Sequence, residues 1–218
     1  MRHRVNLCFH GIGTPRRELE PGEDVYWIKV DLFLSILDEA STWPSVQFSF
    51  DDGNVSDFEV GLPALTERGL RADFFVIADR LDRAGSLESG QVRELNDQGM
   101  TIGSHGAAHR PWPGMDAAAQ EQEFVLARER LADVVAAPVD MAACPLGRYD
   151  RRVLWHLRRL GYRRVFTSDR RPAFAGAWLQ PRFSVRHTDT PESLRAEIMP
   201  GLVERMRLEA VGLAKRLR

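Results

Sequence analysis

Short apolar runs alternate along the chain with longer stretches in which apolar residues recur at helical spacing. The short runs are rich in branched and aromatic side chains, which favour buried strands, and the longer stretches are typical of amphipathic helices. Strands are expected at 5–9, 46–50, 72–77, 100–103, 139–142, 164–167 and 178–185. Helices are expected at 30–40, 57–67, 88–98, 116–135, 150–160 and from 191 onward. This alternation predicts a parallel sheet or barrel with helical crossovers.

Glycines separate these elements. Gly69, Gly99 and Gly161 each follow an expected helix and precede an expected strand, where a left-handed residue commonly ends a helix. No repeat, low-complexity tract or linker interrupts the pattern, so we expect one continuous α/β domain over residues 1–218. Residues 11–24 combine glycines, prolines and mixed charges and predict a long loop. In barrels of this type, polar residues just after the strands are the candidates for function.

Composition narrows the functional classes. The 218 residues are 44% hydrophobic and carry a formal net charge of -1, which gives no general attraction for nucleic acid or for an anionic membrane. No segment approaches the roughly 18 apolar residues of a membrane span, and the first apolar run is too short for a signal peptide. We therefore expect a cytoplasmic protein with no nucleic-acid partner. Cys8 and Cys144 are expected to be reduced and buried.

The expected strand at 46–50 runs directly into two adjacent carboxylates and a glycine, Asp51, Asp52 and Gly53. Neighbouring side chains on extended backbone point to opposite sides, so a turn at Gly53 would let one carboxylate bind a metal while the other faces substrate. An Asp-Gly turn with a helix-capping aspartate explains the same residues without any chemistry. Taken alone, the segment favours this second interpretation.

Two histidines four residues apart, His105 and His109, follow the expected strand at 100–103. At this spacing both imidazoles can reach one ion, although a chance pair on a solvated loop would look the same. With one aspartate they make three ligands and leave a position free for water, as in catalytic metal sites. The occurrence of both motifs at strand ends favours a shared metal site.

These residues resemble the polysaccharide deacetylases of carbohydrate esterase family 4, also called the NodB homology domain. The Asp-Asp-Gly segment is similar to the first motif of that family, and residues 99–109 are similar to its second. Residues 72–76 resemble the third strand, and 144–149 with 160–162 resemble the third motif and its helix, so that the similarity runs from about 46 to 168. The resemblance implies a distorted (β/α)7-type barrel with a divalent metal, usually zinc, that hydrolyses N-acetyl or sometimes O-acetyl groups on sugars.

The family motifs assign a role to each matching position. By this resemblance Asp51 is the general base, and Asp52, His105 and His109 are the ligands of a Zn²⁺ cofactor. In that assignment Asp51 takes a proton from water, and the metal polarises the amide carbonyl. The backbone N–H of Leu146 is expected to donate to the oxyanion, because that role needs no particular side chain.

This sequence departs from the family pattern in two places, and the first is the arginine that orients the base. Its place in the third motif is taken here by Ala143, so the tether is missing or relocated. Arg148 and Arg182 are the candidates to replace it. A surface position is the simpler interpretation for Arg148.

The second departure from the family pattern concerns the motif that supplies the general acid. The late Leu-x-His motif of the family is not clean at His187, where the leucine is missing. Residues 7–11 instead form an apolar strand that ends in His10, and they resemble circularly permuted members of the family that place this strand first. The first and last strands of a closed barrel are neighbours, so the permutation would keep the side chain in place. We therefore expect His10 to be the acid, with His187 as the runner-up.

Three further features leave alternatives open. Trp112 either stacks on a sugar ring or anchors its loop. The arginine-rich stretch 148–171 indicates an anionic sugar polymer, a partner or a plain charged surface. The expected C-terminal helix, 191–218, packs either on the barrel or on a second subunit, which leaves a homo-oligomer open. Its apolar residues include Leu202, Val203, Met206, Val211 and Leu213.

The leading hypothesis is a metal-dependent hydrolase that removes N-acetyl groups from a saccharide or exopolysaccharide. A deacetylase-like amidase acting on a small non-sugar C–N bond would use the same site. A catalytically silent glycan-binding domain is the third hypothesis, suggested by the missing arginine of the third motif. The presence of the base and all three ligands favours an enzyme.

Overall fold

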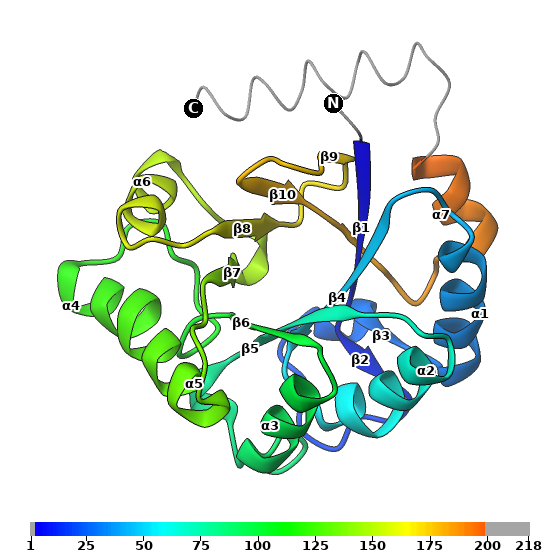
Figure 1. Cartoon of the computed structure of the whole chain (residues 1–218), viewed down its shortest axis with the longest axis horizontal. Coiled ribbons are helices and arrows are strands. Elements are labelled where there is room, and N and C mark those ends of the chain that lie inside the picture. Colours follow the sequence, from blue (N-terminus) through cyan, green and yellow to red (C-terminus); the bar gives the residue numbers. More distant parts are fainter. Residues whose placement is uncertain (1–2, 199–218) are drawn as a thin grey trace.

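The strands predicted from the sequence assemble into a parallel sheet that curves into a nearly closed barrel (Figure 1). The computed structural model describes residues 3–198. Neighbours in the main sheet follow the order β10-β8-β7-β6-β5-β4-β1-β11, and each of these pairs is parallel. These strands are β1 (His3–Phe9), β4 (Val46–Asp52), β5 (Ala72–Val76), β6 (Thr101–Ser104), β7 (Met141–Ala143), β8 (Arg164–Thr167), β10 (Leu179–Pro181) and β11 (Phe183–Ser184). The predicted (β/α)7-type barrel in a single domain is confirmed.

The last predicted strand, 178–185, differs from the prediction because it is split at Arg182. Its first half, β10, pairs with β8, and its second half, β11, pairs with β1. The backbone N–H of Arg182 still donates to the carbonyl of Thr167 at 2.9 Å. The segment therefore passes from one neighbour to the other, and this transfer joins the two ends of the sheet.

Helices pack around the outside of the barrel (Figure 1). Two predicted helices, 57–67 and 116–135, are present, but each contains a π-helical turn, at Asp57–Gly61 and at Glu121–Leu126. Gly69, Gly99 and Gly161 have positive φ, as predicted for helix ends. The α-helices are α1 (Val30–Ser41), α2 (Leu62–Glu67), α3 (Ser89–Asp97), α4 (Ala117–Gln120), α5 (Ala127–Val135), α6 (Arg151–Arg159) and α7 (Pro191–Ile198).

The segment between β1 and α1 is largely the predicted long loop. It contains two short paired strands, β2 (Gly11–Ile12) and β3 (Trp27–Ile28), and a 3₁₀ turn at Glu23–Tyr26. Another short strand, β9 (Ala173–Phe174), pairs antiparallel with β1. The rest of the segment from Gly13 to Gly22 is irregular, which leaves its side chains free to reach the open end of the barrel.

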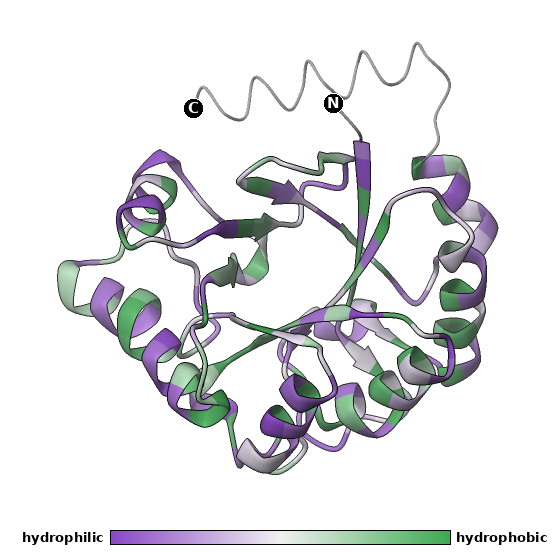
Figure 2. Ribbon diagram, in the orientation of Figure 1, coloured by the Kyte–Doolittle hydropathy of each residue, from purple (hydrophilic) through white to green (hydrophobic). Residues whose placement is uncertain are grey.

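The two faces of the strands carry different kinds of buried side chain. Outward-facing aromatic residues of the strands pack beneath the helices: the rings of Phe50 and Phe74 stack at 4.7 Å, and the ring of Phe9 lies edge-on to that of Phe33 of α1 at 4.9 Å. On the opposite face of β4, Ser49 and Asp51 are equally buried but polar. Hydrophobic and hydrophilic residues alternate along the surrounding helices (Figure 2). The barrel interior can therefore hold charged groups that the outer core would exclude.

The described part of α7 begins at the predicted position, Pro191. The remainder of the predicted C-terminal helix, with Leu202, Val203, Met206, Val211 and Leu213, lies outside the described residues. Within residues 3–198, no helix combines the length and apolar character needed to cross a bilayer. Cys8 and Cys144 are free and buried, as predicted.

Candidate metal centre and active site

Asp51 and Asp52 are the last two residues of β4, and the chain turns sharply at Asp52 and Gly53. Asp52 and Gly53 both adopt positive φ, 76° and 69°, a conformation that costs an aspartate energy and a glycine little. The two carboxylates consequently contact different groups, Asp51 an arginine and Asp52 a pair of histidines. Neither aspartate caps the next helical segment, whose N-cap position is Ser56.

Asp52, His105 and His109 form a ligand triad whose candidate donor atoms all lie within 4.8 Å of one another. Asp52 Oδ1 is 3.5 Å from His105 Nε2 and 3.4 Å from His109 Nε2. This oxygen is buried and has no hydrogen-bond partner among the described residues. Burial lowers the pKa of His105 to about 4, so its imidazole is neutral and able to act as a ligand at neutral pH.

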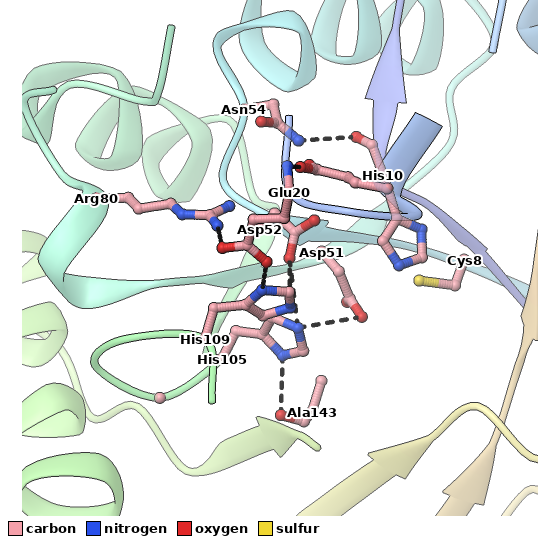
Figure 3. A network of polar contacts seen from close by, with 12 residues as sticks. Cys8, His10, Glu20, Asp51, Asp52, Asn54, Arg80, His105, His109 and Ala143 are labelled. Carbon is pink, nitrogen blue, oxygen red and sulfur yellow. Dashed lines mark hydrogen bonds and ion pairs between the residues drawn. The ribbon is translucent and has the colours of Figure 1, made fainter. Parts of the chain in front are cut away.

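Both histidines of the triad have their second ring nitrogen fixed (Figure 3). His105 Nδ1 lies 2.9 Å from the carbonyl oxygen of Ala143, and His109 Nδ1 lies 2.7 Å from a carboxylate oxygen of Glu20. A proton held on each Nδ1 leaves the lone pair of each Nε2 directed toward Asp52. Two imidazole nitrogens and one carboxylate are a donor set that suits a divalent cation such as Zn²⁺, so the residues fit the cofactor expected from the sequence.

Arg182 holds Asp51 in the barrel interior. Its Nη1 and Nη2 donate to Asp51 Oδ1 and Oδ2, each at 2.6 Å, and its guanidinium lies 5.2 Å and 5.7 Å from the ring centroids of Phe75 and Phe166. Burial raises the pKa of Asp51, but the charge and hydrogen bonds of Arg182, together with the nearby His105 and His10, outweigh burial and hold this pKa well below its usual range. Arg148 is exposed. Of the two candidates for the relocated tether, Arg182 therefore contacts the predicted base.

A cavity of about 260 Å³ is lined by the triad together with Asp51, His10 and Leu146. His10 is half-buried, and its ring packs against Tyr26 with centroids 5.0 Å apart. Leu146 is 53% exposed and adopts a left-handed φ of 56°. His187, the runner-up for the acid, is exposed and is not among the residues that line this cavity.

Glu123 organises the loop that joins the two triad histidines, and the sequence interpretation missed it. Its buried carboxylate accepts hydrogen bonds from the backbone N–H groups of Ala107 and Ala108, at 2.8 and 3.2 Å, and from Trp112 Nε1 at 3.3 Å. Trp112 is 1% exposed and packs edge-on against Phe124. Its alternative role as a sugar-stacking platform is therefore wrong, because the ring is buried as a loop anchor.

Glu20 was also missed, because nothing in a loop of mixed charges indicates which acid turns inward. It lies 89 positions before His109 in the chain. Metal-binding histidines commonly pair with a carboxylate through their second ring nitrogen. This rule indicates that such a partner exists, but it does not identify which acidic residue it is.

Comparison with known proteins bears on the family of the chain. The family model for polysaccharide deacetylases matches residues 39–165, which contain Asp51 and the whole triad. The chain belongs to the polysaccharide deacetylase family. The resemblance inferred from the sequence is thus confirmed. His10, Glu20 and Arg182 lie outside the matched residues, so the family match does not cover every group that meets at the cavity.

The individual relatives of this chain are distant in sequence. The Bacillus subtilis (strain 168) protein YxkH is 24% identical over 124 residues, which are 57% of this chain and 44% of YxkH. The chain thus spans less than half the length of that curated relative. The Streptococcus pyogenes deacetylase PplD, solved in complex with acetate, is similar with a TM-score of 0.78 at 21% identity over 91% of this chain and 99% of that chain. IcaB from Ammonifex degensii gives a TM-score of 0.74 at 22% identity over 89% and 96%.

Proposed function

We propose that this chain is a metal-dependent deacetylase that hydrolyses N-acetyl groups on a saccharide or exopolysaccharide. One observation carries the proposal, namely that the ligand triad, the Asp51 carboxylate and the His10 imidazole line the same cavity. The three residues of the triad suit a divalent metal, Asp51 is a candidate base, and His10 is a candidate acid. Family membership supports the same class of reaction.

The metal would be held by Asp52 together with Nε2 of His105 and Nε2 of His109. When bound, a divalent cation such as Zn²⁺ supplies Lewis-acid polarisation of the acetyl carbonyl and makes water a stronger nucleophile near neutral pH. The neutral state of His105 and the unpartnered Asp52 Oδ1 support this assignment.

The remaining steps belong to the residues of the chain. Asp51, held in place by Arg182, accepts a proton from the attacking water while the oxygen of that water bonds to the acetyl carbon. The N–H of Leu146 donates to the developing oxyanion. His10 then donates a proton to the leaving nitrogen as the C–N bond breaks, and the products are acetate and an amine.

The position of Arg182 also bears on the hypothesis of a silent glycan-binding domain. That hypothesis was motivated by the missing arginine of the third motif, whose place is taken by Ala143. Arg182 supplies a bidentate contact to Asp51 from a different strand end. A binding domain has no need for a buried carboxylate held in this way, which supports an enzyme.

Acetate release tests the proposal. Purified protein loaded with Zn²⁺ is incubated with N-acetylated oligosaccharides, with O-acetylated sugars and with small non-sugar amides, and free acetate is measured enzymatically. We expect turnover of the N-acetylated saccharides and its loss in Asp51→Asn. Turnover confined to the small amides would replace the substrate class, and full activity of Asp51→Asn would refute the assigned base. Glycan binding without acetate release at saturating metal would support the silent domain instead.

A further inference from the structure

Glu20 contacts the metal centre from outside it. The residue belongs to the long loop after β1, and its carboxylate lies 2.7 Å from Nδ1 of His109, the ring nitrogen that does not face Asp52 (Figure 3). The other triad histidine, His105, is held by a main-chain carbonyl instead, that of Ala143 on β7. One ligand is therefore fixed by the barrel itself, and the other is fixed by a side chain from a loop.

Glu20 is itself held on two sides. Its second carboxylate oxygen accepts from Arg80, which lies just after β5 (Figure 3). Its backbone N–H donates to the carboxylate of Glu23 at 2.9 Å. Glu23 pairs with Arg17, and Arg17 Nε donates to Asn54 Oδ1 at 3.0 Å. Asn54 follows Asp52 by two positions. The loop is consequently attached to both the β4 turn and the β5 end, with Glu20 between them.

We propose that Glu20 is a positioning residue that sets the metal affinity of the site through His109, an inference that rests on the proposed function. A carboxylate on Nδ1 keeps the proton there, directs the Nε2 lone pair at the cation and makes the imidazole a stronger donor. Glu20 lies outside the residues that the family model matches. The loop at 11–24 thus completes the metal centre rather than only bordering the cavity.

Charge at the site supports this role. Asp51 is neutralised by Arg182, so Asp52 is the carboxylate that remains to balance a dication among the three ligands. Glu20 places a second carboxylate one imidazole away, where it also pairs with the positive charge of Arg80. Loss of the Glu20 carboxylate should therefore weaken cation binding even if the hydrogen bond to His109 were replaced by water.

Metal affinity in the absence of substrate tests the inference. The full chain and its Glu20→Ala, Glu20→Gln and Glu18→Ala variants are stripped of metal, and the Zn²⁺ dissociation constant is measured by competition with a chelating indicator. Partners of this type typically contribute about 10- to 100-fold in affinity. We expect a loss of that size for Glu20→Ala, a smaller loss for Glu20→Gln because its amide oxygen still accepts a hydrogen bond, and none for Glu18→Ala. Glu18 is an exposed acid of the same loop.

Two further measurements separate positioning of His109 from a merely structural role in the loop. The visible absorption spectrum of the Co²⁺-loaded forms reports ligand geometry, and we expect it to change in Glu20→Ala but not in Glu18→Ala. The melting temperature of the metal-free forms reports loop attachment alone. A lowered melting temperature with wild-type Zn²⁺ affinity and an unchanged Co²⁺ spectrum would overturn the inference and leave the proposed function standing. A wild-type chain that binds no metal would overturn both.

Discussion

Arg182 and Asp51 lie 131 positions apart in the sequence, yet their side chains form two parallel hydrogen bonds of 2.6 Å inside the barrel. Both side chains are buried, and the guanidinium also lies near the faces of two phenylalanine rings. The contact is possible because the last strand breaks at Arg182, between β10 and β11. The position that closes the barrel is therefore also the position that holds the candidate base.

Removal of this arginine should leave an unpaired buried carboxylate. We predict that Arg182→Met lowers the free energy of unfolding by about 3–5 kcal/mol, which is typical when one partner of a buried ion pair is lost. Arg182→Lys should lower it less, because a lysine retains the charge but not the two-pronged geometry. Urea denaturation of the metal-free protein measures both changes.

The same experiment has two controls. Arg148→Met, at an exposed position, should change the unfolding free energy by no more than about 0.5 kcal/mol. The double variant Arg182→Met with Asp51→Asn should recover part of the lost stability, because it no longer buries an unpaired charge. A double variant less stable than Arg182→Met alone would show that the arginine acts through packing rather than through Asp51.

The two histidines considered for the general acid make a matched pair. His10 lines the cavity, whereas His187 is exposed and does not line it. We predict that His10→Gln lowers kcat for acetate release by about 10²- to 10⁴-fold, the range typical of a general acid. His187→Gln should leave kcat within a factor of two or so. The reverse order of effects would assign the acid to His187.

Glu123 offers a test of how the histidine loop is held. Each carboxylate oxygen of Glu123 accepts from one backbone N–H, that of Ala107 or that of Ala108, so in Glu123→Gln the new NH₂ group faces one of these donors. We predict a fall in unfolding free energy of about 1–3 kcal/mol, together with weaker Zn²⁺ binding. Glu121→Gln changes an exposed acid in the same helical turn and should do neither. Equal behaviour of the two variants would exclude the proposed role of Glu123.

The buried carboxyl of Asp73, which does not line the cavity of the ligand triad, is expected to make the stability of the fold depend on pH. Burial raises the pKa of this carboxyl to about 6, although Thr101 and nearby arginines oppose the shift. A folded pKa above the unfolded value means that the carboxyl destabilises the fold once it ionises. The loss begins as the pH rises above about 4, is complete above about pH 6, and amounts to at most about 3 kcal/mol.

Asp73→Asn removes that ionisation while it retains a hydrogen-bonding group of similar shape. The variant should therefore gain stability relative to the wild type between pH 4 and pH 7, and the difference should level off above that range. Urea denaturation of both proteins at several pH values provides the comparison. A stability difference independent of pH would mean that Asp73 does not titrate in this way.

The sequence was sufficient to predict those parts of the site that follow strands. Asp51, Asp52 and His105 each lie at or just after the end of a short apolar run, and the carboxyl ends of parallel strands gather at one end of a barrel. The local pattern thus places these side chains together even without knowledge of their contacts. The first and last strands were also predicted to be neighbours, and β1 pairs with β11.

Other residues of the site could not be identified from the sequence, because their roles depend on contacts between distant segments of the chain. Arg148 and Arg182 are the same residue type, and the break in the last strand decides between them. Glu20 and Glu123 resemble solvated acids in the sequence, because each gains its role from partners on another segment. The burial of Trp112 likewise depends on Glu123, whose buried carboxylate accepts a hydrogen bond from the indole N–H.

Location of a bound metal tests the central claim most directly. Crystals of the protein soaked in Zn²⁺ and measured on both sides of the zinc absorption edge would show the ion by its anomalous scattering. We predict one strong peak at about 2.0–2.2 Å from a carboxylate oxygen of Asp52 and from Nε2 of His105 and His109. A peak at other residues, or none at these three at saturating zinc, would contradict it.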